Sequence, residues 1–407
     1  AGPRPQVSGV KVTEDSAGQG NNVEQGKIAA DSGKKLYITF TSSIEGGTTT
    51  VSPAVPFEVS KNGSYKFTIT GKVGSKTYTK EQTVTVNQYK VNTSALIGKV
   101  VSYTPDTPST GYDLSTAKSG YVIAQTIDST YDPTTWKIMD VDENGNVTKL
   151  LGIGSKIVDF QGAIGYNNGV YLLNDICKNR YGNADLGATA RSLNIEDIEL
   201  RMNATGIEAR KTHTTSSRQY GITRQYTGSN AYYPAIYAQE KYSGVNVSDV
   251  TDDTQVIIDS VDATAQAKMN PNGKTQSENV YTEPTAEIYK TDATTLTCTQ
   301  TEYYFQGTPS SYFDNINFYN MIFKGGGENS YWLASRCISC YSSRSYAGFG
   351  LLLISGYNLY GYPLYNSNNS SDGYGQINRL APVVTFNSAI QIKNGAGTTE
   401  NPYIIGK

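Results

Sequence analysis

The chain has 407 residues, a formal net charge of −2 and one histidine. The near-neutral charge gives no strong electrostatic attraction to nucleic acid or to an anionic membrane surface, so no nucleic-acid partner is expected. A single histidine argues against acid–base or metal chemistry that depends on that side chain. The length predicts two or three domains.

The first 92 residues are predicted to form an all-β domain. Apolar and polar residues alternate, with many β-branched side chains, at 35–41, 65–70 and 82–87. Glycine-containing turn signals at 45–47 and 61–63 separate these segments. Short alternating strands between turns are typical of a β-sandwich. The junction with the next domain is predicted at residues 88–92.

Residues 93–160 continue the β pattern as the β-rich opening of a second domain. An Asp-Glu-Asn-Gly sequence at 142–145 predicts a hairpin turn. A calcium loop is the alternative for this turn, but the remaining spacing of an EF-hand loop is absent. The predicted strands are 98–103, 121–125, 136–139 and 146–151.

Helical periodicity follows. Val170, Leu173, Ile176 and Cys177 recur at the spacing of one helix face. A second helix is predicted to begin at an Asn194 cap, with Ile195, Ile198 and Met202 directed inward. A third is predicted over 312–323, with Phe313, Ile316 and Met321 directed inward. The polar segment 203–300 is predicted to be long loops or an insertion. Helices between two sets of strands indicate an α+β domain.

The stretch 329–384 has an unusual composition. Stiff apolar segments at 331–336 and 380–384 bracket a sequence rich in Tyr, Ser, Asn and Gly. Antibody paratopes use this composition, because Tyr offers a large amphipathic contact area while Ser, Gly and Asn adapt their hydrogen bonds. The stretch is therefore predicted to form a binding surface.

The window from Cys337 to Gly375 contains no Lys, Glu, Gln, Trp or Met. These five residue types cannot arise when the adenines of an Asn codon of the form AAY are replaced by other bases. Every residue type in the window can arise in that way. A polar loop with few charged residues is the alternative interpretation.

The frame Tyr-Trp-Leu-Ala-Ser-Arg, a Phe-Gly pair and Ala-Pro-Val-Val resembles the variable region of proteins diversified by retroelements in bacteria and phages. Upstream, residues 166–177 and 187–198 resemble surface proteins of gut Firmicutes that end in the same frame. Residues 56–68 resemble bacterial immunoglobulin-like modules. The resemblance implies an α+β C-type-lectin-like domain, residues 93–407, preceded by an all-β immunoglobulin-like sandwich, residues 1–92.

In this family the variable residues are exposed and bind ligands, mostly through tyrosine and asparagine side chains. Trp332, Phe349 and Pro382 are expected to belong to the scaffold instead. The resemblance implies ligand contacts by Ile338, Cys340, Tyr341, Ser343, Arg344, Tyr346, Tyr357, Asn358, Tyr360, Tyr362, Tyr365, Asn366, Asn368, Asp372, Tyr374 and Asn378.

Four cysteines leave several possibilities open. Cys337 and Cys340 could be half of a zinc site, a redox pair or a chance pair, and a zinc site needs two further ligands. A disulfide between Cys177 and Cys298 would suit an exported protein. The sugar-binding calcium motif of lectins requires Glu-Pro-Asn, whereas Thr285 follows Glu-Pro here. We therefore expect no metal, no cofactor and no enzymatic activity.

The leading functional hypothesis is a ligand-binding protein of adhesin or receptor-binding type, outside the cell on a bacterial surface or on a virion. Its partner would be a protein or glycan on another cell, a host or a phage. Attachment to a membrane is expected only through an anchor outside this chain. A subunit of a pilus or surface filament is the alternative, with a homo-oligomer as its consequence, and a phage receptor-binding protein is the third.

Overall fold

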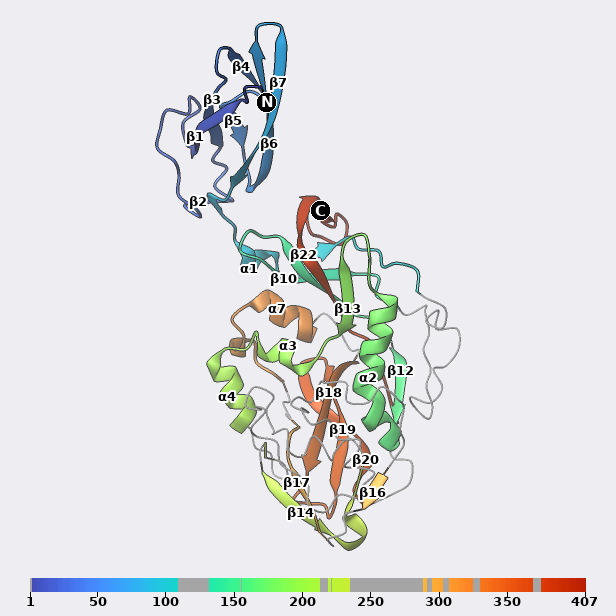
Figure 1. Cartoon of the computed structure of the whole chain (residues 1–407). Helices are drawn as coiled ribbons and strands as arrows, with labels where there is room; N and C mark the ends of the chain where they lie inside the picture. The colour runs from blue at the N-terminus through green and yellow to red at the C-terminus, as the bar shows by residue number, and fades with distance from the viewer. Residues whose placement is uncertain are drawn as a thin grey trace. The chain divides into compact units, whose positions relative to one another are not determined.

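The computed structural model describes residues 2–108, 132–154, 156–212, 219–220, 222–234, 288–290, 295–302, 307–324, 330–368 and 375–407 (Figure 1). It is a mixed α+β structure made mainly of antiparallel sheets. The chain forms two compact units. The first comprises residues 1–96 with 141–146, and the second comprises 97–140 with 147–407.

The first unit contains two three-stranded antiparallel sheets around one core. Phe67 contacts the rings of Phe40 and Phe57 edge-on at 5.4 and 5.6 Å between ring centres. The strands predicted at 35–41, 65–70 and 82–87 are confirmed. One sheet contains β1 (Gln6–Thr13), β3 (Leu36–Ser43) and β5 (Phe57–Val59), and the other β4 (Thr48–Ser52), β6 (Gly63–Val73) and β7 (Lys76–Val86). Shorter elements are β2 (Ile28–Ala29), β8 (Tyr89–Lys90) and α1 (Thr93–Leu96).

The hairpin predicted at 142–145 is confirmed. One carboxylate oxygen of Asp142 accepts hydrogen bonds from the backbone N–H groups of Asn144 and Asn146, both at 2.9 Å. Gly145 has a φ of +80°, a left-handed conformation that glycine adopts without steric cost. The turn connects β10 (Trp136–Val141) to β11 (Val147–Gly152), which are neighbours in a sheet.

The second unit contains two larger sheets. The strand predicted at 98–103 is reduced to two residues, and the one predicted at 121–125 lies outside the described residues. The six-stranded sheet has the order β13 (Ala188–Ser192), β22 (Pro382–Asn394), β11, β10 and β9 (Val100–Val101), with β23 (Ile404–Gly406) paired to β22. The five-stranded sheet has the order β12 (Lys156–Gln161), β21 (Gly375–Arg379), β18 (Ser330–Cys340), β19 (Ala347–Ser355) and β20 (Asn358–Asn366).

Helix α2 (Gly162–Arg180) packs against β12, β18, β19 and β20 of this sheet. Its predicted inward face is confirmed, because Val170, Leu173, Ile176 and Cys177 are fully buried. Gly169 permits the close packing, since a Cβ at this position would lie 2.4 Å from a methyl carbon of Leu351. The helix therefore covers one face of the sheet that carries the Tyr- and Ser-rich stretch.

Helix α3 (Ile195–Glu199) begins at the predicted Asn194 cap. The predicted helix over 312–323 is only partly correct. Asn315 caps a new helix by accepting a hydrogen bond from the N–H of Phe318 at 2.9 Å, which resets the helical phase and leaves Ile316 52% exposed. The segment consists of η5 (Ser310–Tyr312), α7 (Ile316–Tyr319) and η6 (Asn320–Lys324), and Phe313 and Met321 are buried as predicted.

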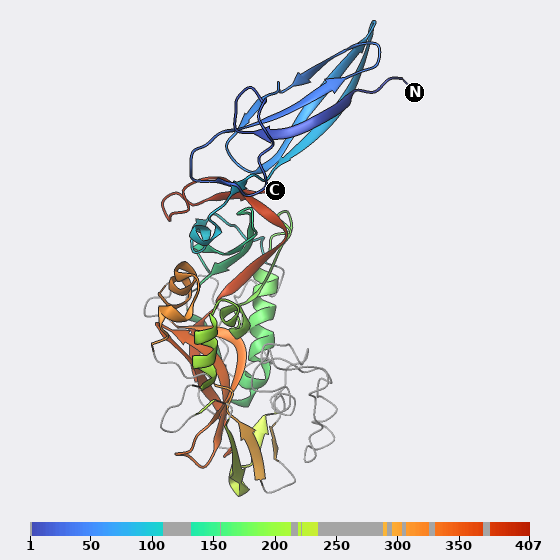
Figure 2. The same cartoon turned by 90° about the vertical axis from the view of Figure 1, so that its left-hand side faces the viewer.

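The prediction of long loops or an insertion at 203–300 is only partly correct, because the described parts of this segment contain a helix and strands. They form helix α4 and two antiparallel ribbons, β14–β17 and β15–β16. Both views place the β14–β17 ribbon beyond the ends of β18 and β19 (Figures 1 and 2). The elements are α4 (Ala204–Thr212), β14 (Thr223–Thr227), η2 (Gly228–Asn230), β15 (Tyr232–Pro234), β16 (Ile288–Lys290) and β17 (Thr295–Thr299). No helix in the described part of the chain has the length and apolar character of a membrane span.

Candidate ligand-binding surface

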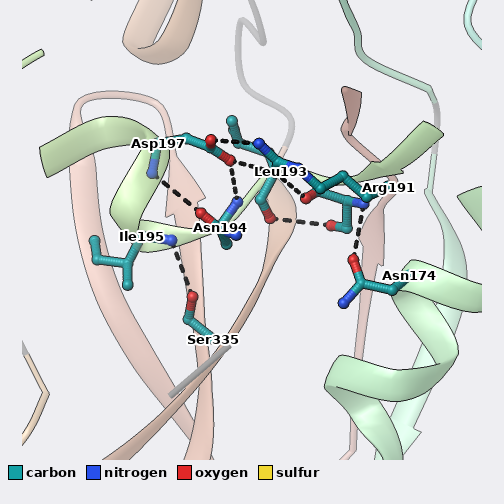
Figure 3. Close-up of polar contacts among 8 residues, drawn as sticks. Asn174, Arg191, Leu193, Asn194, Ile195, Asp197 and Ser335 are labelled. Atoms are coloured by element: carbon teal, nitrogen blue, oxygen red, sulfur yellow. Dashed lines mark hydrogen bonds and ion pairs between the residues drawn. The ribbon is translucent and has the colours of Figure 1, made fainter. Parts of the chain in front are cut away.

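A polar cluster around the start of α3 holds the frame of the Tyr- and Ser-rich stretch (Figure 3). The carboxylate of Asp197 accepts hydrogen bonds from both terminal nitrogens of Arg191 at 2.7 Å. It also accepts from the backbone N–H of Asn194 at 3.0 Å, while the Asn194 side chain accepts from the N–H of Asp197 at 3.0 Å. This reciprocal capping box fixes the helix start relative to β13.

The same cluster connects the two apolar segments that bracket the stretch. The Ser335 hydroxyl of β18 accepts a hydrogen bond from the N–H of Ile195 at 2.9 Å. The carbonyl of Leu193 accepts from the N–H of Ala334 at 2.9 Å, and the N–H of Leu193 donates to the carbonyl of Ala381 at 2.8 Å. Residues 331–336 and 380–384 are therefore joined through one segment near α3.

The three expected scaffold residues lie in the interior. Trp332 is fully buried, and its indole N–H donates to the carbonyl of Val158 at 3.1 Å. Phe349 is fully buried against the ring of Tyr166 at 5.6 Å between ring centres, and Pro382 is buried at the start of β22. Large buried aromatic side chains with a satisfied polar atom contribute strongly to a core.

Beyond its pairing with β21 at Tyr331, β18 is bonded along that edge to residues 300–302. The backbone N–H of Ile338 donates to the Thr301 hydroxyl at 2.7 Å, and the Ile338 carbonyl accepts from the N–H groups of Thr301 and Glu302 at 2.9 and 3.1 Å. The N–H of Cys340 donates to the side-chain carbonyl of Gln300. Backbone and side-chain groups of residues 300–302 thus take the place of a neighbouring strand and satisfy polar groups that would otherwise be buried without partners.

Glu302 is a buried carboxylate that links two strands. One oxygen accepts a hydrogen bond from the Ser339 hydroxyl of β18, and the other accepts from the N–H of Gly361 in β20 at 2.9 Å. Gly361 has no room for a side chain, because a Cβ there would lie 2.2 Å from the sulfur of Cys337 and 3.1 Å from the Cγ of Glu302. These contacts hold β18 and β20 in fixed positions.

Six of the residues expected to contact ligand are buried instead. The prediction that Tyr341 and Tyr365 are exposed is wrong, since they retain 4% and 1% of their exposure. Because β18 lies inside a sheet covered by α2 and by residues 300–302, its side chains do not reach solvent. The buried residues are Ile338, Cys340, Tyr341, Tyr365, Asn366 and Asn378.

Specific interaction partners explain why Tyr365 and Asn378 are buried. The ring of Tyr365 packs on Phe349 at 6.3 Å between ring centres, and burial raises the pKa of Tyr365 above its ordinary value. The side chain of Asn378 accepts a hydrogen bond from the hydroxyl of Ser330. Both side chains therefore contact other buried residues of the sheet.

The remaining expected contacts are accessible to different extents. Ser343, Arg344 and Tyr357 are exposed. Asp372 and Tyr374 lie outside the described residues. The half-buried residues are Tyr346, Asn358, Tyr360, Tyr362 and Asn368.

The accessible residues do not form one continuous surface. Since β18, β19 and β20 are antiparallel neighbours, the loop 341–346 and the turn at 356–357 lie at opposite ends of the sheet. At the second end, the Tyr357 carbonyl accepts from the N–H of Thr308 at 2.8 Å. The Asn358 side chain there accepts from the N–H of Gly307 at 2.8 Å. The single predicted surface is therefore divided into two.

An open hollow of about 390 Å³ lies at the first end, between the loop after β18 and the ribbon strand β14. The guanidinium of Arg344 lies 4.7 Å from the ring centre of Tyr341 and 5.8 Å from that of Tyr346. Across the hollow, Arg224 donates through its Nε to the carbonyl of Cys340 at 3.3 Å. The hollow is lined by residues 223–227, Asn230, Tyr341, Ser342, Arg344 and Ser345.

The cysteines do not form the sites considered from the sequence. Cys337 and Cys340 belong to one strand and are three residues apart, so their side chains point to opposite faces of the sheet. All four cysteines are buried and none forms a disulfide, so the bond considered between Cys177 and Cys298 is absent. Interaction with the side chain of Cys298, together with burial, raises the pKa of the Cys340 thiol instead. In the described residues, no group of three or more potential ligands could hold a metal ion.

Two residues of this region were missed by the sequence analysis. Arg224 lies within the segment 203–300, and Glu302 lies just after its end. No local pattern marks either residue, because their roles depend on pairing with a strand more than thirty positions further along the chain.

No family model, curated protein or solved structure matches the chain. Its own residues and geometry therefore carry the functional proposal.

Proposed function

We propose that this chain is a surface-displayed ligand-binding protein, with a C-type-lectin-like domain that presents the ligand-binding surface and an immunoglobulin-like module before it. The observation that carries the proposal is the contrast between β18, which is buried along its whole length, and residues 342–345, which are exposed directly after it. A rigid strand followed by an exposed loop is how binding residues are commonly positioned.

The loop has the composition of a binding surface. Residues 341–346 are Tyr, Ser, Ser, Arg, Ser and Tyr, and they belong to the window that contains no Lys, Glu, Gln, Trp or Met. Both ends of the loop are anchored, because Cys340 pairs with Gln300 and the N–H of Ala347 donates to the Ser367 hydroxyl at 2.9 Å. Anchored loops lose less conformational entropy on binding, which favours affinity.

The thiols support binding rather than catalysis. Cysteine nucleophiles react as thiolates and need a lowered pKa and access to substrate. Burial raises the pKa of Cys177, and the contact with Cys298 together with burial raises that of Cys340. Both side chains are fully buried. These features oppose a role as a nucleophile.

The first unit supports a role as a spacer. Its two three-stranded antiparallel sheets enclose their own core, so it has the features of an independently folded module. Immunoglobulin-like modules have this sandwich architecture. The α+β second unit, with α2 on its five-stranded sheet, is compatible with a lectin-like scaffold.

The test is an array of glycans and surface proteins screened with the whole chain and with a loop variant, Arg344→Ala combined with Tyr346→Ser. We expect a ligand that binds the wild type and is lost by the loop variant. Tyr357→Ser, at the opposite end of the sheet, is the matched control and should retain binding. A ligand that is lost only by the Tyr357 variant would refute the assignment of the binding surface.

Diversification is tested separately by sequencing the gene in many sister cells. We expect substitutions concentrated in codons 337–378, and above all in those for the exposed loop residues. Substitutions spread evenly along the gene would contradict diversification by a retroelement while leaving the binding proposal in place.

A further inference from the structure

We propose that the hollow beside the loop 341–346 binds an acidic saccharide, with Arg224 and Arg344 engaging its carboxylate or sulfate group. We call this site the arginine hollow, lined by residues 223–227, Asn230, Tyr341, Ser342, Arg344 and Ser345. The inference rests on the proposed function and specifies the chemical class of its ligand.

The arginine hollow carries a local excess of positive charge. Among the described residues, its lining contains two arginines and no aspartate or glutamate. The whole chain has 36 acidic residues against 34 basic ones, so the local excess of positive charge is not a property of the chain as a whole. Within the described residues, the ion pairs involve other arginines and lysines. Two arginines on one hollow, neither paired with a carboxylate in the part of the chain that the structure describes, favour an anionic ligand.

The arginine side chains are held in position. The Nε of Arg224 donates to the carbonyl of Cys340 in a buried strand at 3.3 Å, a bond that does not use its two terminal nitrogens. Arg344 lies against the rings of Tyr341 and Tyr346 and donates to the Tyr346 hydroxyl at 3.4 Å. A planar guanidinium fixed in this way binds an oxyanion through two parallel hydrogen bonds at little further cost in entropy.

The neutral residues of the hollow favour a saccharide over a peptide. The described part of the lining contains no aliphatic side chain, and Asn230, Ser342 and Ser345 supply amide and hydroxyl groups there. Such groups match the hydroxyls of a sugar ring. The volume of about 390 Å³ falls within the range of about 300–1,000 Å³ that is typical of small-molecule sites.

The test measures binding of the whole chain to four probes by titration calorimetry. Oligogalacturonate carries carboxylates, a heparin-derived oligosaccharide carries sulfates, maltooligosaccharide is neutral, and oligoglutamate is an acidic peptide. We expect one or both acidic oligosaccharides to bind, with an affinity that falls as salt rises, and the other two probes not to bind. The first two probes distinguish the carboxylate from the sulfate.

The variants assign the binding to the arginine hollow. Arg224→Gln and Arg344→Gln should each lower the affinity about tenfold or more, since each removes a charge-assisted hydrogen-bond donor. Arg344→Lys should retain part of the affinity. Arg4→Gln removes the same charge at an exposed position in the other unit and should have no effect. Thermal melting confirms that each variant is folded.

Two outcomes would overturn the proposal. One is that no acidic oligosaccharide binds, and the other is that the acidic peptide or neutral sugar binds as tightly as the acidic sugars. Binding unaffected by either glutamine variant would place the ligand elsewhere and also refute it. If an array ligand still depends on Arg344 and Tyr346 while acidic sugars fail, then the binding function stands and only its ligand class is wrong.

Discussion

The strands β18–β20 and the loop 341–346 between the first two of them come from one stretch of similar composition, but they lie in opposite environments. Tyr365 on β20 retains 1% of its exposure, whereas the loop residues after Tyr341 are exposed or half-buried. Depth in the sheet, rather than residue type, decides which side chains can meet a ligand. A tyrosine-rich composition therefore marks a candidate region without marking its surface.

Tyrosine can occupy both the buried strands and the exposed loop, because its ring is apolar and its hydroxyl needs only one hydrogen-bond partner. In the interior, the Tyr226 hydroxyl donates to the Tyr341 carbonyl at 3.4 Å, and that of Tyr319 donates to the Thr308 carbonyl at 2.6 Å. Burial raises the pKa of both hydroxyls and keeps them neutral. The same side chain at a loop tip presents its hydroxyl to solvent.

The largest expected effect on stability is at Trp332, near the start of the buried strand β18. Trp332→Ala should lower the free energy of unfolding by about 3–5 kcal/mol, because it leaves a large cavity. It also removes the donor to the Val158 carbonyl and the ring contact with Phe160 at 5.2 Å. Urea unfolding measures the change. A loss below about 1 kcal/mol, the size of an ordinary substitution, would place this side chain outside the core.

Tyr365→Ser should destabilise the protein by about 3 kcal/mol, within the range for loss of a large buried ring. The residue lies in a buried cluster with Phe349 and Tyr166. Tyr365→Phe is the matched control, and it should retain most of the stability because the ring remains. Thermal melts of the two variants decide between burial and exposure. A Tyr365→Ser variant that melts like the wild type would restore this residue to the binding surface.

Gly361→Ala should cost about 1–3 kcal/mol through overpacking. The added methyl group would lie 2.2 Å from the sulfur of Cys337, which is itself buried. Gly375→Ala is the control, since the nearest atom to a Cβ there is 3.6 Å away. Combining Gly361→Ala with Cys337→Ala should cost less than the sum of the single changes. Strict additivity would show that the two strands are not packed as described.

Asn194→Ala should cost about 1 kcal/mol, the usual value for a lost helix cap. Its side chain accepts from the N–H of Asp197 in the capping box. Asn194→Ser keeps a capping oxygen and should retain most of the stability. Urea unfolding distinguishes them, and equal losses for the two variants would show that the cap is not the cause.

The parts of the fold that follow local patterns were predictable. The face of α2, the Asn194 cap and the hairpin at 142–145 each depend on residues a few positions apart. Within the third helix region, the restart at Asn315 changed the helical phase, so the inward position predicted for Ile316 was wrong.

The candidate site was only partly predictable. The loop 341–346 could be found from composition, but the burial of Ile338 and Cys340 could not. It depends on residues 300–302 pairing with the edge of β18, and on α2 covering its face. Neither of these long-range contacts produces a periodic pattern in the sequence. Arg224 reaches the site for the same reason, through a ribbon that no local signal revealed.

The smallest expected effect is Tyr357→Ser, at the turn on the far end of the sheet. Its side chain is 51% exposed, and its contact with the segment around Thr308 uses the backbone carbonyl, which the substitution retains. Exposed substitutions usually change stability by about 0.5 kcal/mol or less. Tyr365→Ser makes the same chemical change on the adjoining strand, so the two melts compare this change at a buried and at an exposed position. If Tyr357→Ser destabilises the chain as much as Tyr365→Ser, then the turn belongs to the core and the division between buried strands and exposed ends is wrong.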